Sequence, residues 1–304
     1  MTHAPTCRRW KPLSSWAWCF VAVLLSCSAA VAQDSVIPSR CHIWGPFEVG
    51  AWSRVQVDVE VYERGQRLHH VERTVTRVLK RRDEQGYQLD IDTWERLGVA
   101  LGPRERRTTE TGDYPWFVSA DRLKDLGEES RSELEWQGET ISCQVFEYET
   151  VQSGRVISHR DLFHADRFPF FLGRLVVRTP EGEPERIEAR EYSRVIESEV
   201  PIFLGDRIVS GVLTKTTLDS PERSVVILEE LAPEVPGGLV SKRVVERDRD
   251  GAIVRREVVS LVDFGDASDW EQNDGESGQL ETSRLRGRLF RRWNRADGSD
   301  DSRQ

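Results

Sequence analysis

The sequence lacks the surplus of basic residues that general nucleic-acid binding requires. Its 304 residues include 43 Lys and Arg against 52 Asp and Glu, which gives a formal charge of -9. Binding to nucleic-acid phosphates depends on basic side chains that displace counterions. We therefore expect no nucleic-acid partner.

Recognisable catalytic motifs are missing as well. The sequence contains no G-x-S-x-G, S-x-x-K or H-E-x-x-H motif and no phosphate-binding loop, which are local patterns of several hydrolase and nucleotide-binding classes. Their absence favours a non-enzymatic protein and gives no reason to expect a cofactor. A hydrolase whose site is assembled across strands would leave no such motif, and it is the alternative.

The first 32 residues have the composition of an export signal. Basic residues at 8–11 precede an apolar stretch at 16–25, and Ala-Val-Ala follows at 30–32. This order predicts a signal peptide over residues 1–32, because the apolar stretch is shorter than the roughly 20 residues that a membrane span needs. We expect an exported protein, in the periplasm or outside the cell. The letters LLSC ending at Cys27 also resemble a bacterial lipobox, so a lipid anchor at Cys27 is an alternative.

Cysteine is scarce beyond this leader, where only Cys41 and Cys143 occur. Two cysteines in an exported protein predict one disulfide, here closing a loop of about 100 residues, worth roughly 4 to 5 kcal/mol in the chain-entropy model. Two free thiols or a nucleophilic thiol are the alternatives. Cys143 lies in an alternating run with no histidine at a suggestive spacing, which disfavours a nucleophile.

Helical periodicity is almost absent, and period-two alternation takes its place. Valines at 55, 57, 59 and 61 alternate with mostly polar residues, which predicts a strand with one face in a core and the other in water. Arg64-Gly65 then predicts a turn, and 68–79 a return strand. One short helix is predicted near 119–126, capped by Ser119.

An internal repeat is the most informative pattern. A shift of 67 residues aligns 138–177 with 205–244 at nine identities over 40 positions, and 47–65 can be laid on 233–251 as a fainter third copy. Hairpins of this kind bury their apolar faces only by pairing with one another. We predict a mainly β domain over 41–264, after a linker at 33–40, with repeats at about 138–196 and 205–263. It forms a large twisted antiparallel sheet or half-barrel, and one barrel or two half-barrels remain open.

Two segments carry a resemblance to a known family. The segment 44–52 reads W-G-x-F-x-x-G-A-W, 235–240 reads V-P-G-G-x-V, and Asp250-Gly251 marks a hairpin. In these patterns the chain resembles uncharacterised exported β-rich proteins of planctomycete bacteria, which implies fold and location but no activity. The curved meander and the V-P-G-G segment also resemble LolA-type periplasmic lipoprotein carriers, whose half-barrel holds acyl chains; this resemblance implies an apolar ligand and no particular binding residue.

The C-terminal tail departs from the β pattern. Residues 265–283 are acidic and rich in Gly and Ser, which predicts a disordered linker. Residues 284–304 begin with a basic segment in which leucines at 285 and 289 and Trp293 recur every four residues, as on one side of an amphipathic helix. A basic amphipathic helix of this kind can lie on anionic lipid or hold an acidic partner. A disordered tail, or one that folds back onto the acidic domain, is the competing interpretation. The residues predicted to make the contact are Arg284, Arg286, Arg288, Arg291, Arg292, Trp293 and Arg295.

A calcium site is a weak alternative in the last predicted hairpin. Glu246, Asp248, Asp250 and Glu257 occupy positions 1, 3, 5 and 12 of the EF-hand spacing. The flanking segments are strands instead of helices, and four nearby arginines would oppose a dication. A hairpin turn at Asp250-Gly251 explains the pattern better, so we predict no metal site here.

Histidine and aspartate pairs on single strands do not predict a site either. His69 and His70 point to opposite faces of a strand, as do His159 and His164 if their strand is regular. Asp90 and Asp92 share a face, but alternation places that face in water.

Three functions follow for an exported β protein. The leading hypothesis is a binding protein of the cell envelope that holds an apolar ligand or an envelope partner on a curved sheet. The alternatives are a hydrolase using His159, Asp161 or His164, and a structural surface module tethered through its basic tail. The oligomeric state is left open.

Overall fold

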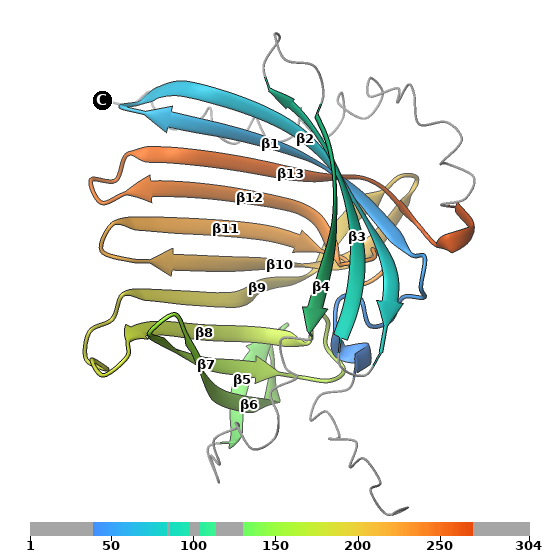
Figure 1. Cartoon of the computed structure of the whole chain (residues 1–304). Coiled ribbons are helices and arrows are strands. Elements are labelled where there is room, and N and C mark those ends of the chain that lie inside the picture. Colours follow the sequence, from blue (N-terminus) through green and yellow to red (C-terminus); the bar gives the residue numbers. More distant parts are fainter. Residues whose placement is uncertain (1–38, 84–85, 98–103, 114–129, 270–304) are drawn as a thin grey trace, which may run out of the picture. The chain divides into compact units, whose positions relative to one another are not determined.

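The computed structural model describes residues 39–83, 86–97, 104–113 and 130–269 (Figure 1). The predicted signal peptide, the predicted helix at 119–126 and the arginine-rich segment 284–304 lie outside the described residues. No helix in the described ranges has the length and apolar character that crossing a membrane requires.

The described chain is almost entirely β. A 3-10 helix, η1 (Ser39–Cys41), precedes the strands, and residues 267–269 are helical after the last one. The strands are β1 (Trp52–Glu63), β2 (Gln66–Arg82), β3 (Gly86–Leu97), β4 (Arg104–Asp113), β5 (Arg131–Trp136), β6 (Glu139–Gln152), β7 (Arg155–Phe163), β8 (Phe171–Pro180), β9 (Ala189–Leu204), β10 (Arg207–Asp219), β11 (Arg223–Leu231), β12 (Leu239–Asp248) and β13 (Ile253–Gly265).

All thirteen strands form one antiparallel sheet in the order β4-β3-β2-β1-β13-β12-β11-β10-β9-β8-β7-β6-β5. Neighbours in the sheet are neighbours in sequence except for β1 and β13, which join the beginning and the end of the described chain. The sheet is not closed, and β4 and β5 are its edges. The predicted mainly β, large antiparallel sheet is therefore confirmed.

The strand positions have the spacing that a repeated hairpin unit would give. Strands β10, β11 and β12 each begin 68 residues after β6, β7 and β8, at Arg207, Arg223 and Leu239 against Glu139, Arg155 and Phe171. The 67-residue sequence repeat itself stays a prediction.

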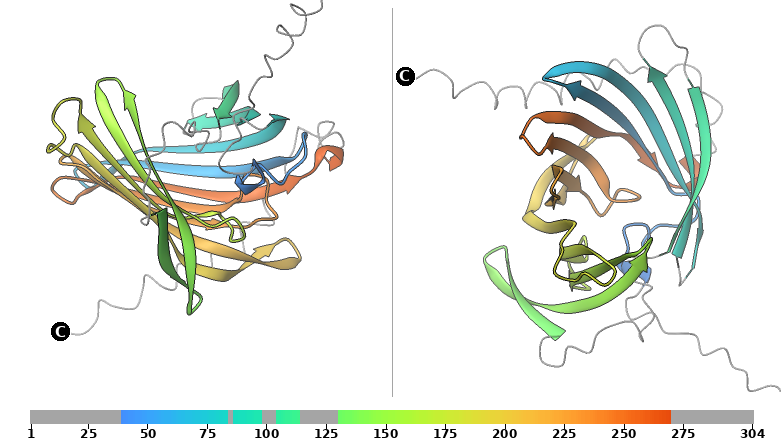
Figure 2. Two further views of the ribbon diagram at one scale, coloured as in Figure 1. Left: turned by 90° about the horizontal axis from the view of Figure 1, so that it is seen from below. Right: turned by 60° about the vertical axis from the view of Figure 1, so that its left-hand side comes forward.

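The segment before β1 shows that the sheet curls. Cys41 packs with Phe146 of β6, whereas Trp44 packs with Leu79 of β2. These strands are nine positions apart in the sheet order, which is about 43 Å in a flat sheet at about 4.8 Å per strand. Three residues of chain span only about 10 Å. The sheet must therefore curve around this segment (Figure 2), and the face that carries Phe146 and Leu79 is called the inner face.

Register extends this inner face across the sheet. Successive cross-strand partners run from Phe146 through Asp161, Arg174, Ser193, Thr216, Ile227, Val244, Glu257 and Val59 to Val71. Side chains two residues apart on each strand share the face. The opposite side is called the outer face.

The two segments singled out in the sequence meet at one end of the inner face. The Gly237 N–H donates to the Ile43 carbonyl at 3.3 Å. Gly237 has a φ of +80°, and a Cβ atom there would lie 2.8 Å from Cζ2 of Trp44. Glycine is needed for both the backbone conformation and the close approach.

The predicted disulfide between Cys41 and Cys143 is not formed, and this expectation is corrected. Both cysteines are buried and free, but Cys41 packs with Phe146 and Phe163, while Cys143 packs in another cluster with Leu172. Burial raises the pKa of each thiol above its usual value. Because only a thiolate is a good nucleophile, these thiols serve as small apolar core residues.

Candidate binding face of the sheet

A buried ion pair lies on the inner face between β7 and β8. Asp161, only 1% exposed, accepts two hydrogen bonds from Arg174, from Nε at 2.7 Å and from Nη2 at 2.9 Å. The two residues are direct cross-strand partners. Burial lowers the pKa of Arg174, but the hydrogen bond to Asp161 and the charge of Asp161 outweigh that effect and raise it. The pair is a bidentate, charge-assisted interaction of the strong kind.

Two aromatic rings extend this cluster. Tyr148 and His159 are cross-strand partners of β6 and β7, and their rings stack at 4.4 Å with planes 7° apart. Burial, the charge of Asp161 and a hydrogen bond to Asp161 raise the pKa of Tyr148 to about 12. Burial and the charge of Arg174 lower the pKa of His159. These four residues, Tyr148, His159, Asp161 and Arg174, are called the ion-pair cluster.

The ion-pair cluster could be only partly anticipated from the sequence. Asp161 was a candidate hydrolase residue, but its partner Arg174 was not identified. The signal available in the sequence was strand alternation, which places Ile157, His159, Asp161 and Phe163 on the same, inward face of one strand. A carboxylate in such an inward series needs a partner when it is buried.

A second charged group crosses the inner face from β11 to β13. Glu229 and Lys242 are cross-strand partners. Lys242 Nζ lies 3.8 Å from Oε1 of Glu257, and Arg255 pairs with the same carboxylate. Burial raises the pKa of Glu229, and the charge of Lys242 offsets part of that rise. Glu229, Lys242, Arg255 and Glu257 are called the carboxylate cluster.

Apolar side chains occupy the inner face between these two clusters. Leu218 pairs with Val225, and Ile227 pairs with Val244, across β10, β11 and β12. Val244 is buried, and the other three are half-buried. These four residues are called the inner apolar strip.

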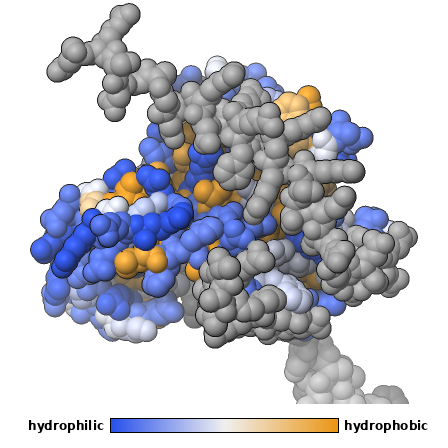
Figure 3. All heavy atoms as spheres, turned by 90° about the horizontal axis from the view of Figure 1, so that it is seen from above, coloured by the Kyte–Doolittle hydropathy of each residue, from blue (hydrophilic) through white to orange (hydrophobic). Residues whose placement is uncertain are grey.

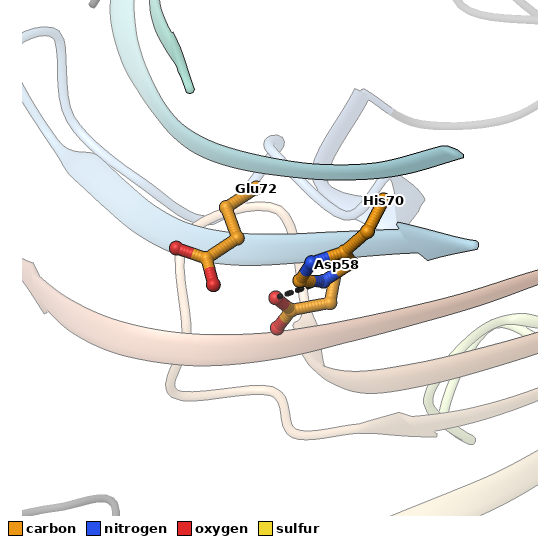
Figure 4. Close-up of side chains that lie close together, drawn as sticks. All are labelled: Asp58, His70 and Glu72. Carbon is orange, nitrogen blue, oxygen red and sulfur yellow. Dashed lines mark ion pairs between the residues drawn. The ribbon is translucent and has the colours of Figure 1, made fainter. Parts of the chain in front are cut away.

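The outer face carries a separate cluster on β1 and β2. Asp58 and Glu72 are direct cross-strand partners, and His70 lies on the same face two residues before Glu72. His70 Nε2 is 3.7 Å from Oδ1 of Asp58. One ligand atom from each of the three residues lies within 4.8 Å of the others. Figure 4 shows the three side chains close together.

The sequence did not reveal this cluster, because a one-residue irregularity decides it. Glu63 pairs with Gln66 and Tyr62 with Arg67, but Val61 pairs with His69, which leaves Leu68 as an extra residue. Without that bulge, the hairpin register would place His69 instead of His70 beside Asp58. His69 and His70 do lie on opposite faces, as expected.

The four carboxylates of the calcium alternative have other partners. Glu246 pairs with Arg223, and Glu257 with Arg255. Asp248 accepts backbone hydrogen bonds from the following turn, and Asp250 lies 3.8 Å from Arg249. Within the described ranges, these carboxylates do not form a group of ligand atoms within 4.8 Å.

The remaining candidates lie apart. His164 is in the loop after β7, where its Nδ1 accepts from the Asp166 N–H at 3.3 Å, away from the strand that holds His159. Asp90 lies 3.6 Å from Lys80 on the outer face, while Leu89 of the same strand is buried. The contacts predicted for the arginine-rich segment stay predictions.

The surface also mixes apolar and polar side chains. Val226 on the outer face is 37% exposed, and the cross-strand pair Phe203 and Ile208 is 58% and 62% exposed. Figure 3 shows such apolar residues between hydrophilic ones on the face seen from above.

Comparisons with known proteins give no family. No family model matches the chain, and no curated protein sequence matches it. Among solved structures, a Bacteroides fragilis protein with a YmcC-like fold, provisionally described as exported, is 8% identical with a TM-score of 0.28, covering 71% of this chain and 97% of its own. An N-terminal dehydratase from the difficidin assembly line is 10% identical with a TM-score of 0.12, covering 69% of this chain and 78% of its own. At such TM-scores neither likeness carries an argument about fold or function.

Proposed function

We propose that this chain is an exported, non-enzymatic binding protein that holds an apolar or amphiphilic ligand on the inner face of its sheet. The observation that carries the proposal is the inner apolar strip, because three of its four side chains are only half-buried and all four face the concave side of the sheet. Apolar surface of this kind gains free energy when a ligand removes it from water. Export rests on the leader composition of residues 1–32.

The charged clusters on both sides favour a ligand with a polar end. Arg174 and Lys242 are cations at the two borders of the inner apolar strip, and each is already paired with a carboxylate. A ligand with an acyl chain and an anionic headgroup would bury its chain on the strip and place its headgroup beside one of these cations. Such a mixture of an apolar surface and a few placed polar groups is usual for small-molecule sites.

Two adjacent residues with opposite orientation test the proposal. Ile227 lies on the inner apolar strip, whereas Val226 of the same strand faces outward. The full-length protein would be titrated with the fluorescent fatty acid cis-parinaric acid. Ile227→Glu is expected to weaken binding at least about tenfold, since a buried carboxylate facing the acyl chain costs more than about 1.4 kcal/mol, and Val226→Glu to leave it within about twofold.

Equal effects of the two substitutions, or no saturable binding by the unchanged protein, would contradict the proposal. A carboxylate-cluster variant then locates the headgroup: a preference for acidic over methyl-ester probes that disappears in Lys242→Gln places the headgroup at the carboxylate cluster. A preference that is unchanged in Lys242→Gln places it elsewhere on the inner face.

A further inference from the structure

We propose that Asp58, His70 and Glu72 form a binding site for a divalent transition-metal ion of the Zn²⁺ class on the outer face of β1 and β2. Zinc binds both imidazole nitrogen and carboxylate oxygen, and a site with three protein ligands leaves its fourth position to water or substrate. All three residues lie on one face of two paired strands. A fourth position would be left for water or another ligand.

The distances are within reach of coordination. The ligand atoms lie within 4.8 Å of one another, and His70 Nε2 is 3.7 Å from Asp58 Oδ1. Zinc bonds of about 2.0 to 2.2 Å in a tetrahedral arrangement place the ligand atoms roughly 3.3 to 3.6 Å apart. The His70 and Asp58 side chains are 40% and 32% exposed, so small rotations about their side-chain bonds can close the remaining gap without disturbing a core.

The register provides a physical reason for a cation here. Asp58 and Glu72 are directly opposite each other on neighbouring strands, and like charges in this position repel. A dication between the two carboxylates replaces that repulsion by attraction to both. Glu72 is also the cross-strand partner of Arg96 of β3, and the metal ion would take one oxygen from each carboxylate.

The backbone makes the site rigid. Strands β1 and β2 are paired on both sides within the sheet, by β13 and by β3, and sites on strands hold ligands more accurately than sites on loops. The bulge at Leu68 fixes the histidine that joins the two carboxylates. The imidazole makes the set unsuitable for Ca²⁺ and Mg²⁺, which take oxygen ligands.

The neighbouring histidines provide a matched test. Zn²⁺ would be titrated into the full-length protein in competition with a chromogenic chelator. We expect one Zn²⁺ per chain whose affinity falls at least about tenfold in His70→Gln and stays within about twofold in His69→Gln, which removes the same group from the opposite face. Asp58→Asn and Glu72→Gln are expected to weaken binding as His70→Gln does.

A second measurement reports the ligands directly. Co²⁺ in the same site is expected to give visible absorption bands of a tetrahedral nitrogen and oxygen set, and His70→Gln to remove them. Circular dichroism checks that each variant folds, which we expect because all three side chains are partly exposed. The inference is overturned if no zinc binds at one ion per chain, if His69→Gln and His70→Gln weaken binding equally, or if Ca²⁺ binds as tightly as Zn²⁺.

Discussion

The Asp161 and Arg174 pair allows a quantitative prediction about stability. Arg174→Met keeps most of the side-chain volume but leaves the Asp161 carboxylate, 1% exposed, without its two charge-assisted hydrogen bonds. Removing one partner of a buried pair typically costs about 3 to 5 kcal/mol, because the remaining charge stays buried and uncompensated. At roughly 2 to 4 °C per kcal/mol for a domain of this size, the Tm should fall by roughly 6 to 20 °C.

The same two strands provide the control. Arg160 is the residue before Asp161, faces outward, and pairs with Glu147 at 2.7 Å with side chains 44% and 21% exposed. Arg160→Met should cost less than about 1 kcal/mol, since exposed pairs are weak. Urea denaturation and thermal melts of the full-length protein would compare the two variants.

Two results would refute the reasoning. The first is an equal loss of stability in Arg174→Met and Arg160→Met, which would mean that burial does not strengthen the inner pair. The second concerns the double variant Asp161→Leu with Arg174→Met, which removes both charges and should be more stable than Arg174→Met alone. A double variant less stable than Arg174→Met would show that the uncompensated carboxylate is not the cause of the loss.

Three further predictions concern groups elsewhere in the fold. Burial lowers the pKa of His42 to about 4, so below pH 6.5 the side chain takes up a proton when the protein unfolds. The stability should therefore fall as the pH drops from 6.5 towards 4, by about 2 kcal/mol at pH 5. Thermal melts of the unchanged protein would measure this pH dependence, which His42→Asn should lack. Gly237→Ala should lower the Tm more than Gly251→Ala, because both glycines have positive φ but only the first would place a Cβ against Trp44; equal losses would exclude that contact as the cause. Because burial raises the pKa of Glu229, its charge is unfavourable in the fold at neutral pH, so Glu229→Gln should raise the Tm at pH 7, and an unchanged or lower Tm would count against this.

The sequence predicted the strand content well because alternation is a local property. In β1, the side chains of Val55 and Val59 are buried at 1% and 6% exposure, as alternation indicated. Trp44 and Trp52, at the start of the described domain, are also buried, at 3% and 1% exposure. In any paired strand, successive side chains alternate between the two faces of the sheet, so one set points inward and the other outward.

The candidate sites depended on contacts that no local pattern encodes. The ion-pair cluster needs β6, β7 and β8 in register, and the outer cluster needs the bulge at Leu68. The disulfide expectation failed for a related reason. Counting cysteines says nothing about distance, and the curl of the sheet places Cys41 and Cys143 in different clusters.

The amino-acid sequence by itself determined that this protein is built from antiparallel hairpins, because alternation and Gly-containing turns act over a few residues. Only the tertiary structure decided which face became the concave one, since that depends on the segment around Trp44 reaching from β6 to β2. It also decided which charges meet. Pairing of β1 with β13, and a single extra residue in β2, join groups far apart in the chain, and a one-residue change of register exchanges every side chain between the inner and outer faces.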